Sequence, residues 1–184
     1  MDLDTAIKSR RSVKKFSSKK ANWKHIIECI DSMRYAPTAG KNFVLKFIVV
    51  SEKEKLKKIA KLSDQDFIAT VEYIVIVYSD PSRTKNLFGE RGEIYTRQQA
   101  GAAIQNFLLK IIEKGLSTCW IGHFDEEKLK KEFKIPDGMN VEALFPVGYE
   151  EKKEKPSRKI SLDNVLYFEE HKKKQMKKIR KINI

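Results

Sequence analysis

The sequence predicts an α+β domain in which helices cover both faces of a central sheet. Strand-like runs alternate with segments of helical period, and several of the connections between them are irregular. The clearest strand is predicted at residues 73–80, which are β-branched and aromatic and end at Asp80-Pro81. The clearest helix is predicted at residues 96–114, where apolar side chains recur at offsets of three and four.

Two helices are predicted before the first strand. Asp2 or Asp4 can cap a short helix that ends near Ser9. A second helix is predicted from Asn22 to about Arg34 because apolar residues follow a helical period there. Its predicted buried side carries Trp23, Ile26, Ile27, Ile30 and Met33.

The middle of the chain continues the alternation. Residues 45–51 predict a strand, and Ser51 with Glu54 offers a capping box for the following helix. That helix is expected to bury Leu56, Ile59 and Ala60. Residues 81–96 show no clean period and are predicted to form an irregular excursion before the long helix.

The long helix is expected to end before Gly115, which can adopt the left-handed conformation that closes a last turn. The small residues of the same helix, at 101–103, leave one flank thin enough for another backbone to approach. Residues 116–122 then predict a short buried strand that ends in a glycine. Asp125 can cap a further helix that ends at Ile135.

The last predicted strand covers residues 141–149 and is expected to be broken by Pro146 and Gly148. The length of 184 residues suits one domain with a normal core. We therefore expect a single domain over residues 1–170, followed by a basic tail at 171–184.

Composition and cysteine usage indicate a globular protein of the cytoplasm. The hydrophobic fraction is 41%, and no apolar run approaches the roughly 20 residues of a membrane span. The N-terminus lacks the apolar segment of a signal peptide. Cys29 and Cys119 lie far apart, and neither belongs to a CxxC motif or a Cys/His cluster, which predicts two buried reduced thiols.

The net charge of +13 raises the alternative of a nucleic-acid-binding protein. Residues 171–184 carry seven of the cations and no acid, which leaves +6 for residues 1–170. Aromatic residues do not interleave with these cations as stacking platforms would, so nucleic acid is disfavoured as a partner. The tail can instead pack on a partner subunit through Met176, Ile179 and Ile182.

Several chemistries lack their motifs. The chain has neither a GxGxxG motif after a strand nor a GxxxxGK[ST] loop, and its three histidines lack metal-ligand spacing. Residues 9–16, SRRSVKKF, contain four cations and two hydroxyls. This composition suits either a solvated basic turn or an anion site, because guanidinium groups and hydroxyls are good donors to phosphate.

Four sequence blocks together resemble the FMN-dependent nitroreductase family. They are RRSVKKF at 10–16, APTAGKNFVLKFIVV at 36–50, QAGAAIQNFLLKIIEKGLSTCWIG at 99–122 and FPVGYEEKKEKPSRK at 145–159. The family's corresponding motifs are RRSxRxF, APSAGNxQPWxFxVV, GAAxQNxLL with GLGTCWIG, and PxGYP…R. Each block alone is a weak signal, but all four occur in the family's order and span nearly the whole chain.

The resemblance implies a three-layer α/β/α sandwich with a mixed, mainly antiparallel sheet. It implies an intertwined homodimer that binds two FMN molecules at its interface, with the long helix of each subunit in that interface. The implied activity is transfer of a hydride from NAD(P)H through flavin N5 to a nitroaromatic, a quinone or a related small acceptor, by ping-pong kinetics. No catalytic side chain is then required, since the flavin carries the chemistry.

The resemblance also assigns cofactor-binding roles to individual residues. The first block would hold the phosphate, ribityl chain and pyrimidine edge of FMN, and a late arginine would bind the phosphate. A loop in the second block would lie against the partner's flavin. The end of the strand in the third block would line the flavin ring, and a side-chain amide would lie near the ring. The residues of the first block are Arg10, Arg11, Ser12 and Lys14, and the late arginine is Arg158. The loop consists of Pro37, Thr38, Ala39 and Gly40. The strand end is Ile121 and Gly122, and the amide belongs to Gln65.

Departures from the family pattern put the electron acceptor in question more than the cofactor. Lys41 replaces an asparagine and His123 replaces a glycine, so either side chain is a candidate modulator of the flavin. A solvent-facing lysine and a packed or surface histidine are the alternatives. Further departures are Phe43, Val44, Leu45, Gln99 and Glu150. Reductive dehalogenation and flavin fragmentation remain alternative chemistries on the same fold.

Overall fold

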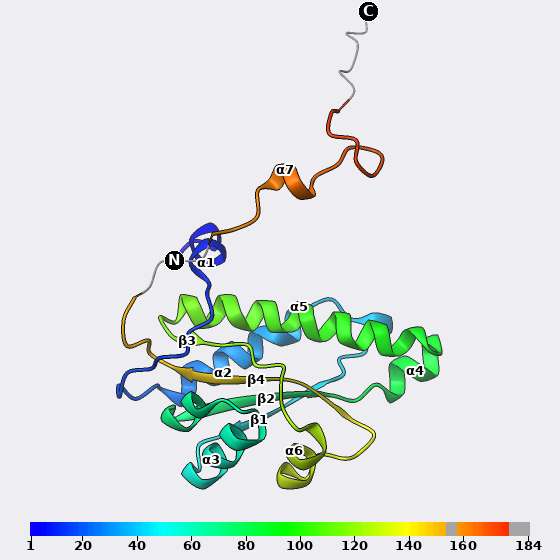
Figure 1. The fold of residues 1–184 in the computed structure, drawn as a ribbon. Helices are drawn as coiled ribbons and strands as arrows, with labels where there is room; N and C mark the ends of the chain where they lie inside the picture. The colour runs from blue at the N-terminus through cyan, green and yellow to red at the C-terminus, as the bar shows by residue number, and fades with distance from the viewer. Residues whose placement is uncertain (154–157, 177–184) are drawn as a thin grey trace, which may run out of the picture.

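A computed structural model describes residues 1–153 and 158–176 of the chain. Its centre is a four-stranded sheet in the order β1-β2-β4-β3, with helices on both faces (Figure 1). The strands are β1 (Leu45–Val50), β2 (Tyr73–Ser79), β3 (Ser117–Thr118) and β4 (Asn140–Gly148). Because helices cover both faces of this sheet, the predicted three-layer α+β architecture is confirmed. All pairings are antiparallel, and no parallel pair occurs among these four strands.

Strand β2 illustrates how the sequence builds two cores. Because successive side chains of a strand point to opposite faces, Val75 and Val77 enter one core while Ile74 and Ile76 enter the other. All four side chains are fully buried. A strand that is apolar on both faces therefore lies in the middle of a three-layer sandwich, as β2 does.

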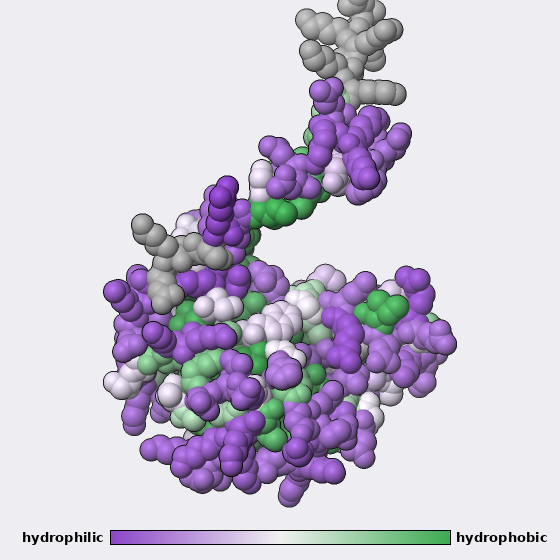
Figure 2. Space-filling view, viewed as in Figure 1, coloured by the Kyte–Doolittle hydropathy of each residue, from purple (hydrophilic) through white to green (hydrophobic). Residues whose placement is uncertain are grey.

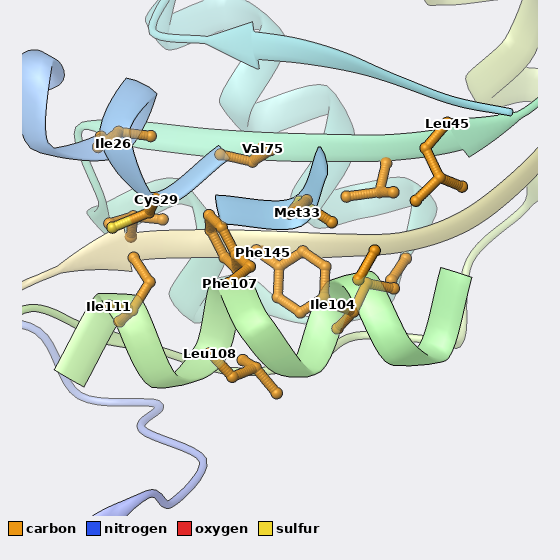
Figure 3. Packing of buried hydrophobic residues seen from close by; sticks show 14 of the residues in the cluster. Ile26, Cys29, Met33, Leu45, Val75, Ile104, Phe107, Leu108, Ile111 and Phe145 are labelled. Atoms are coloured by element: carbon orange, nitrogen blue, oxygen red, sulfur yellow. The ribbon is translucent and has the colours of Figure 1, made fainter. Parts of the chain in front are cut away.

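One face of the sheet is covered by α2 (Trp23–Ser32), the following η1 (Met33–Tyr35) and the long α5 (Arg91–Glu113). Figure 3 shows the side chains of these helices packed against β2 and β4. The rings of Phe107 from α5 and Phe145 from β4 have centroids 5.2 Å apart. The helix predicted from Asn22 to about Arg34 begins at Trp23 and continues as the 3-10 turn η1 after Ser32. Asn22 is its N-cap, since its side chain accepts a hydrogen bond from the N–H of Lys24.

The opposite face is covered by α3 (Lys53–Leu62), η3 (Asp66–Thr70) and α6 (Glu126–Phe133). The predicted capping box of α3 is wrong, because the residue at the N-cap is Glu52 and no side chain caps the helix. Asp125 caps α6 as predicted. The helix ends at Phe133 rather than at Ile135, since Lys134 adopts a left-handed conformation.

The predicted irregular excursion before the long helix is also wrong. It contains α4 (Ser82–Phe88), and α5 begins at Arg91. Few residues of this stretch are buried, so no apolar period reveals the helices in the sequence. The two helices approach closely at Gly92, where an added Cβ would lie 2.2 Å from the carbonyl oxygen of Thr84. The end of α5 is as predicted, with Gly115 at φ 68°.

Pro146 does not break its strand, contrary to expectation. It pairs with Ile74 within the β2–β4 ladder, which continues beyond it to the pair of Tyr73 and Val147. Its carbonyl accepts a hydrogen bond from the hydroxyl of Thr118, and the N–H and C=O of a strand residue point to the same side. The absent N–H of Pro146 therefore faces the β3 side, where β3 has already ended, and no bond to β2 is lost.

The predicted strand at residues 116–122 is shorter than expected. Only Ser117–Thr118 pairs continuously with β4, and Ile121 forms an isolated bridge to Leu144. Beyond β4, α7 (Leu162–Val165) lies away from the sheet on an extended segment (Figure 1). Figure 2 shows apolar side chains along this segment. Its exposed apolar residues are Ile160, Leu162, Val165, Leu166 and Met176.

The predicted tail at 171–184 is described only as far as residue 176, so Ile179 and Ile182 lie outside the described residues. Both cysteines are buried free thiols, as predicted. Within residues 1–153 and 158–176, no helix is long and apolar enough to cross a membrane. The same part of the chain contains no cluster of three or more His, Cys, Asp or Glu residues suited to a metal ion.

Candidate functional site

The basic segment after α1 (Leu3–Ser9) is bound to the edge of the sheet by its backbone. The N–H of Val13 donates to the carbonyl of Thr118 at 3.0 Å. The N–H of Ser17 donates to the carbonyl of Tyr149 at 2.8 Å. The N–H of Glu151, in the chain after β4, donates to the carbonyl of Lys15 at 3.1 Å. The segment is therefore held in an extended conformation between β3 and the end of β4.

These bonds shape a cavity of about 220 Å³ whose lining is strongly basic. It contains four cations, one carboxylate and one hydroxyl, contributed by the segment itself and by the chain after β4. Such a concave cluster of cations favours the anion site over the solvated turn, because converging donors are what a phosphate needs. The lining residues are Arg11, Ser12, Val13, Lys14, Lys15, Glu150 and Lys152.

Arg11 forms an ion pair with Glu150 in this cavity. Both side chains are only 19% exposed, so the pair is shielded from solvent more than an ordinary surface pair. Glu150 forms an antiparallel bridge with Phe16, which places its carboxylate beside the basic segment. The sole carboxylate of the lining thus contacts the guanidinium that is expected to bind an anion.

Lys14 connects this cavity to Gln65, which precedes η3. Its Nζ lies 3.4 Å from the amide oxygen of Gln65 and 5.6 Å from the centre of the Phe67 ring. Phe67 in turn stacks on Phe16, with ring centroids 6.4 Å apart. The structure therefore brings together Lys14 and Gln65, two predicted site residues that are 51 positions apart in the sequence.

Cys119 lies next to the same segment. Burial raises the pKa of its thiol, while a hydrogen bond with Ser12 and the charge of Lys14 lower it. The net direction is upward, so the thiol stays protonated near neutral pH. Cys119 therefore contributes packing beside the cavity rather than a thiolate.

The stretch after β3 presents Gly122 and His123 to solvent. Ile121 anchors this stretch, since its N–H and C=O both pair with Leu144 at 3.0 Å and its side chain is buried. Trp120 packs its ring edge-on against Phe145 and is 43% exposed. The exposed backbone at Gly122 thus follows a rigidly held residue, as a wall for a planar ligand requires.

The predicted second loop lies elsewhere on the molecule. Pro37 and Gly40 are exposed, whereas Thr38 and Ala39 are partly buried. An added Cβ at Gly40, whose φ is 58°, would approach the side chain of Leu87 in α4 at 3.1 Å. Just after this loop, the carbonyl of Asn42 accepts a hydrogen bond from Gln99 of α5. About 14 residues of helix, or about 21 Å, separate Gln99 from the end of α5.

Within one subunit, this distance keeps the second loop away from the basic cavity. Lys41 is exposed and adopts a φ of 58°. Arg10 is the partly buried C-cap residue of α1, and Arg158 is exposed. Neither arginine lines the cavity. Only some of the predicted site residues therefore come together within one subunit, namely Arg11, Ser12, Lys14 and Gln65.

Sequence reasoning missed four lining residues, of which Val13 is apolar and the other three are charged. Lys15 lies in the basic motif itself, so its spacing next to Lys14 could have indicated it. Glu150 and Lys152 lie in a charged stretch in which acids and cations alternate. Nothing in that alternation distinguishes a residue that faces the cavity from one that faces solvent.

The fold and the cavity together define a class of protein: a three-layer α/β/α sandwich with a basic cavity where the first extended segment meets the central sheet. The model of the Nitroreductase family matches residues 7–69 and 58–149. These matches cover more than half of the chain. The chain belongs to the nitroreductase family.

Three known proteins illustrate the relationship. A protein of Methanothermobacter thermautotrophicus, provisionally named NADH dehydrogenase/NAD(P)H nitroreductase, is 27% identical over 81% of this chain and 78% of its own length. An iodotyrosine deiodinase of Thermotoga neapolitana is 24% identical over 77% of this chain and 85% of its own. The NADPH:FMN oxidoreductase of Vibrio harveyi, solved with NAD+, superposes with a TM-score of 0.83 at 16% identity, over 93% of this chain and 78% of that one. This last similarity shows the fold.

Proposed function

We propose that this protein is an FMN-dependent oxidoreductase that takes reducing equivalents from NADH or NADPH and passes them to a small acceptor such as a nitroaromatic or a quinone. The observation that carries the proposal is the basic cavity around Arg11, Ser12 and Lys14. Family membership and the names of the relatives agree with this chemistry.

The donors of the cavity fit the phosphate monoester of FMN. A phosphate dianion needs several converging cations and hydroxyls, and Arg11 can offer a fork of N–H groups to it. Ser12 supplies a hydroxyl, and Lys14 and Lys15 supply ammonium groups from the same segment. In the proposal, Arg10 and Arg158 add further positive charge next to this group.

The remaining proposed contacts concern the flavin ring. Gln65 offers an amide that lies beside Lys14, and Gly122 offers exposed backbone directly after the bridge that holds Ile121. In the proposal, Ile121 and Gly122 together line the ring. When bound, FMN supplies a ring that accepts a hydride at N5 and passes it on. The protein's part is to hold the phosphate, to orient the ring and to shield it from water. His123 and Lys41, both exposed, are proposed modulators of ring and acceptor.

The proposed unit is a homodimer, because one subunit does not gather all the residues that the flavin needs. The loop at 37–40 is separated from the basic cavity of its own subunit by much of the length of α5. In the proposal it reaches the flavin of a second copy instead. Gly101 on α5 has no atom within 4 Å of an added Cβ, so its flank is open to another backbone. Exposed apolar side chains on α5 and on the helices packed against it include Leu3, Ile7, Tyr35, Leu87 and Ile94.

A cavity of about 390 Å³ also lies between α1, η1 and α5. Its lining includes Leu3, Tyr35 and Leu109, and a partner subunit could fill it. The exposed apolar segment around α7 is a further candidate for contact with the partner. Buried free thiols suit a reducing compartment, and a cytoplasmic location is part of the proposal.

A second candidate function is reductive dehalogenation on the same cofactor. The similarity to an iodotyrosine deiodinase over 77% of this chain favours it, although the nitroreductase relative is more similar. Both chemistries would use the same cavity, so only the acceptor distinguishes them.

The test is a spectrum of the purified protein, followed by anaerobic titration with NADH and NADPH. We expect flavin absorption as purified or after FMN is added, and bleaching by one of the two nicotinamides. Reoxidation by a nitroaromatic, a quinone or a halogenated phenol then identifies the acceptor class. A colourless protein that FMN cannot reconstitute would contradict the proposal.

A further inference from the structure

The carboxylate of Glu150 contacts Arg11 in the basic cavity, and both side chains are 81% shielded from solvent. A carboxylate and a phosphate bind a guanidinium through the same pair of N–H donors. Only one of the two anions can therefore use these donors of Arg11 at a time. The cavity contains a resident anion before any ligand enters.

From this contact we infer that Glu150 competes with the phosphate of a bound flavin for Arg11 and so sets the selectivity between FMN and unphosphorylated riboflavin. The inference rests on the proposed function, since it names the group that limits binding at the same site. A phosphate dianion that enters must displace Glu150 and then lie close to its negative charge. Riboflavin carries no phosphate and meets neither cost.

The arrangement of the backbone allows Glu150 to be replaced without damage to the sheet edge. In the bridge between Phe16 and Glu150, the hydrogen bonds run from Ser17 to Tyr149 and from Glu151 to Lys15. The N–H of Glu150 takes no part in them. Both Glu150→Gln and Glu150→Pro should therefore keep the bridge, and proline is a second variant with a different side chain.

The experiment measures the affinity of the full chain for FMN and for riboflavin by quenching of flavin fluorescence. Glu150→Gln and Glu150→Pro are compared with the unchanged protein, and thermal unfolding verifies that each variant is folded. Glu151→Gln is the matched control, because it removes the same charge from an exposed neighbour that is not among the lining residues.

We expect both Glu150 variants to bind FMN on the order of tenfold more tightly, since a like charge beside a buried anion is removed. Their affinity for riboflavin and the affinity of Glu151→Gln for FMN should change less than about twofold. If FMN binds the unchanged protein and folded Glu150 variants equally well, the inference is overturned while the proposed function stands. If no form of the protein binds FMN, the proposed function is overturned and the inference with it.

Discussion

The side-chain amide oxygen of Gln99 accepts a hydrogen bond from the backbone N–H of Val44 at 2.9 Å. The same amide donates from its nitrogen to the carbonyl of Asn42 at 3.0 Å. Gln99 is 3% exposed, so these bonds form away from water. One side chain of α5 thus fixes the loop that leads from Gly40 into β1.

The two bonds predict the effect of Gln99→Glu, which replaces the amide by a carboxylate of nearly the same shape. A carboxylate can still accept from Val44, but it has no donor for Asn42 and brings its charge close to that carbonyl. We expect a loss of about 1–3 kcal/mol in the free energy of unfolding, measured with urea. Gln98→Glu, on an exposed neighbour, should stay within about 0.5 kcal/mol. Equal losses in both variants would refute this role of Gln99.

Local patterns in the sequence were sufficient for most of the fold. Residues 73–80 were recognisable as a strand because the β-branched and aromatic residues that favour a buried strand lie next to one another in the sequence. The helix at 82–88 was not recognisable, since only Thr84 within it is buried and no apolar period results. Pro146 misled because its absent N–H faces β3, and whether that loses a ladder hydrogen bond depends on where β3 ends.

The candidate site was predictable where it is local and not where it is formed by tertiary contacts. The basic motif indicated Arg11 and Lys14 because four cations and two hydroxyls lie within eight residues. The ion pair between Arg11 and Glu150 joins segments that only the β3–β4 edge brings together. No spacing rule indicates such a pair, so its role emerges from the structure alone.

Lys41 is expected to cost stability through its backbone. Its φ of 58° lies in the left-handed region, where an ordinary L-residue is disfavoured by roughly 1–2 kcal/mol and asparagine is tolerated better. Lys41→Asn should therefore raise the free energy of unfolding by about 0.5–1 kcal/mol, whereas Lys41→Val should lower it. Lys20→Asn, at an exposed lysine outside the positive-φ residues, controls for the lost charge. Gains of the same size at both positions would exclude the backbone explanation.

Gly92 is expected to be intolerant of any side chain. An added Cβ would lie 2.2 Å from the carbonyl oxygen of Thr84, which is backbone and cannot rotate away. Gly92→Ala should separate α4 from α5 and cost about 2–3 kcal/mol in thermal or urea unfolding. Gly138→Ala meets no atom within 4 Å and should stay within about 0.5 kcal/mol. A stable Gly92→Ala protein would show that the two helices do not need this close approach.

Gly101 tests the proposed dimer. Nothing lies within 4 Å of a Cβ added at Gly101, so a side chain there leaves the backbone without a clash at Cβ, and thermal unfolding of the variant verifies that the subunit is folded. Gly101→Trp should convert the proposed dimer to a monomer in sedimentation experiments and weaken FMN binding with it. Gly138→Trp, at a second open glycine, should do neither. If Gly101→Trp remains a dimer with normal FMN affinity, the interface lies elsewhere.

Cys29 predicts the response of the protein to alkaline pH and to thiol reagents. Burial raises the pKa of its thiol from 9.0 to about 12, although Lys114 and Lys110 act in the opposite direction. Below pH 9 the thiol is protonated in both the folded and the unfolded state. Between pH 9 and about 12 the unfolded state loses this proton first, so the contribution of Cys29 to stability falls as pH rises.

We therefore expect the free energy of unfolding to decline less steeply between pH 9 and 10.5 in Cys29→Ala than in the unchanged protein. A second measurement uses Cys119→Ala, which leaves Cys29 as the one remaining thiol. Because the thiolate is the reactive form, Cys29 should react with a disulfide reagent at pH 8 only as fast as the protein unfolds. Denaturant should accelerate this reaction in proportion to the unfolded fraction. Rapid labelling of the native protein would mean that Cys29 is accessible and that its thiol titrates as in a free peptide.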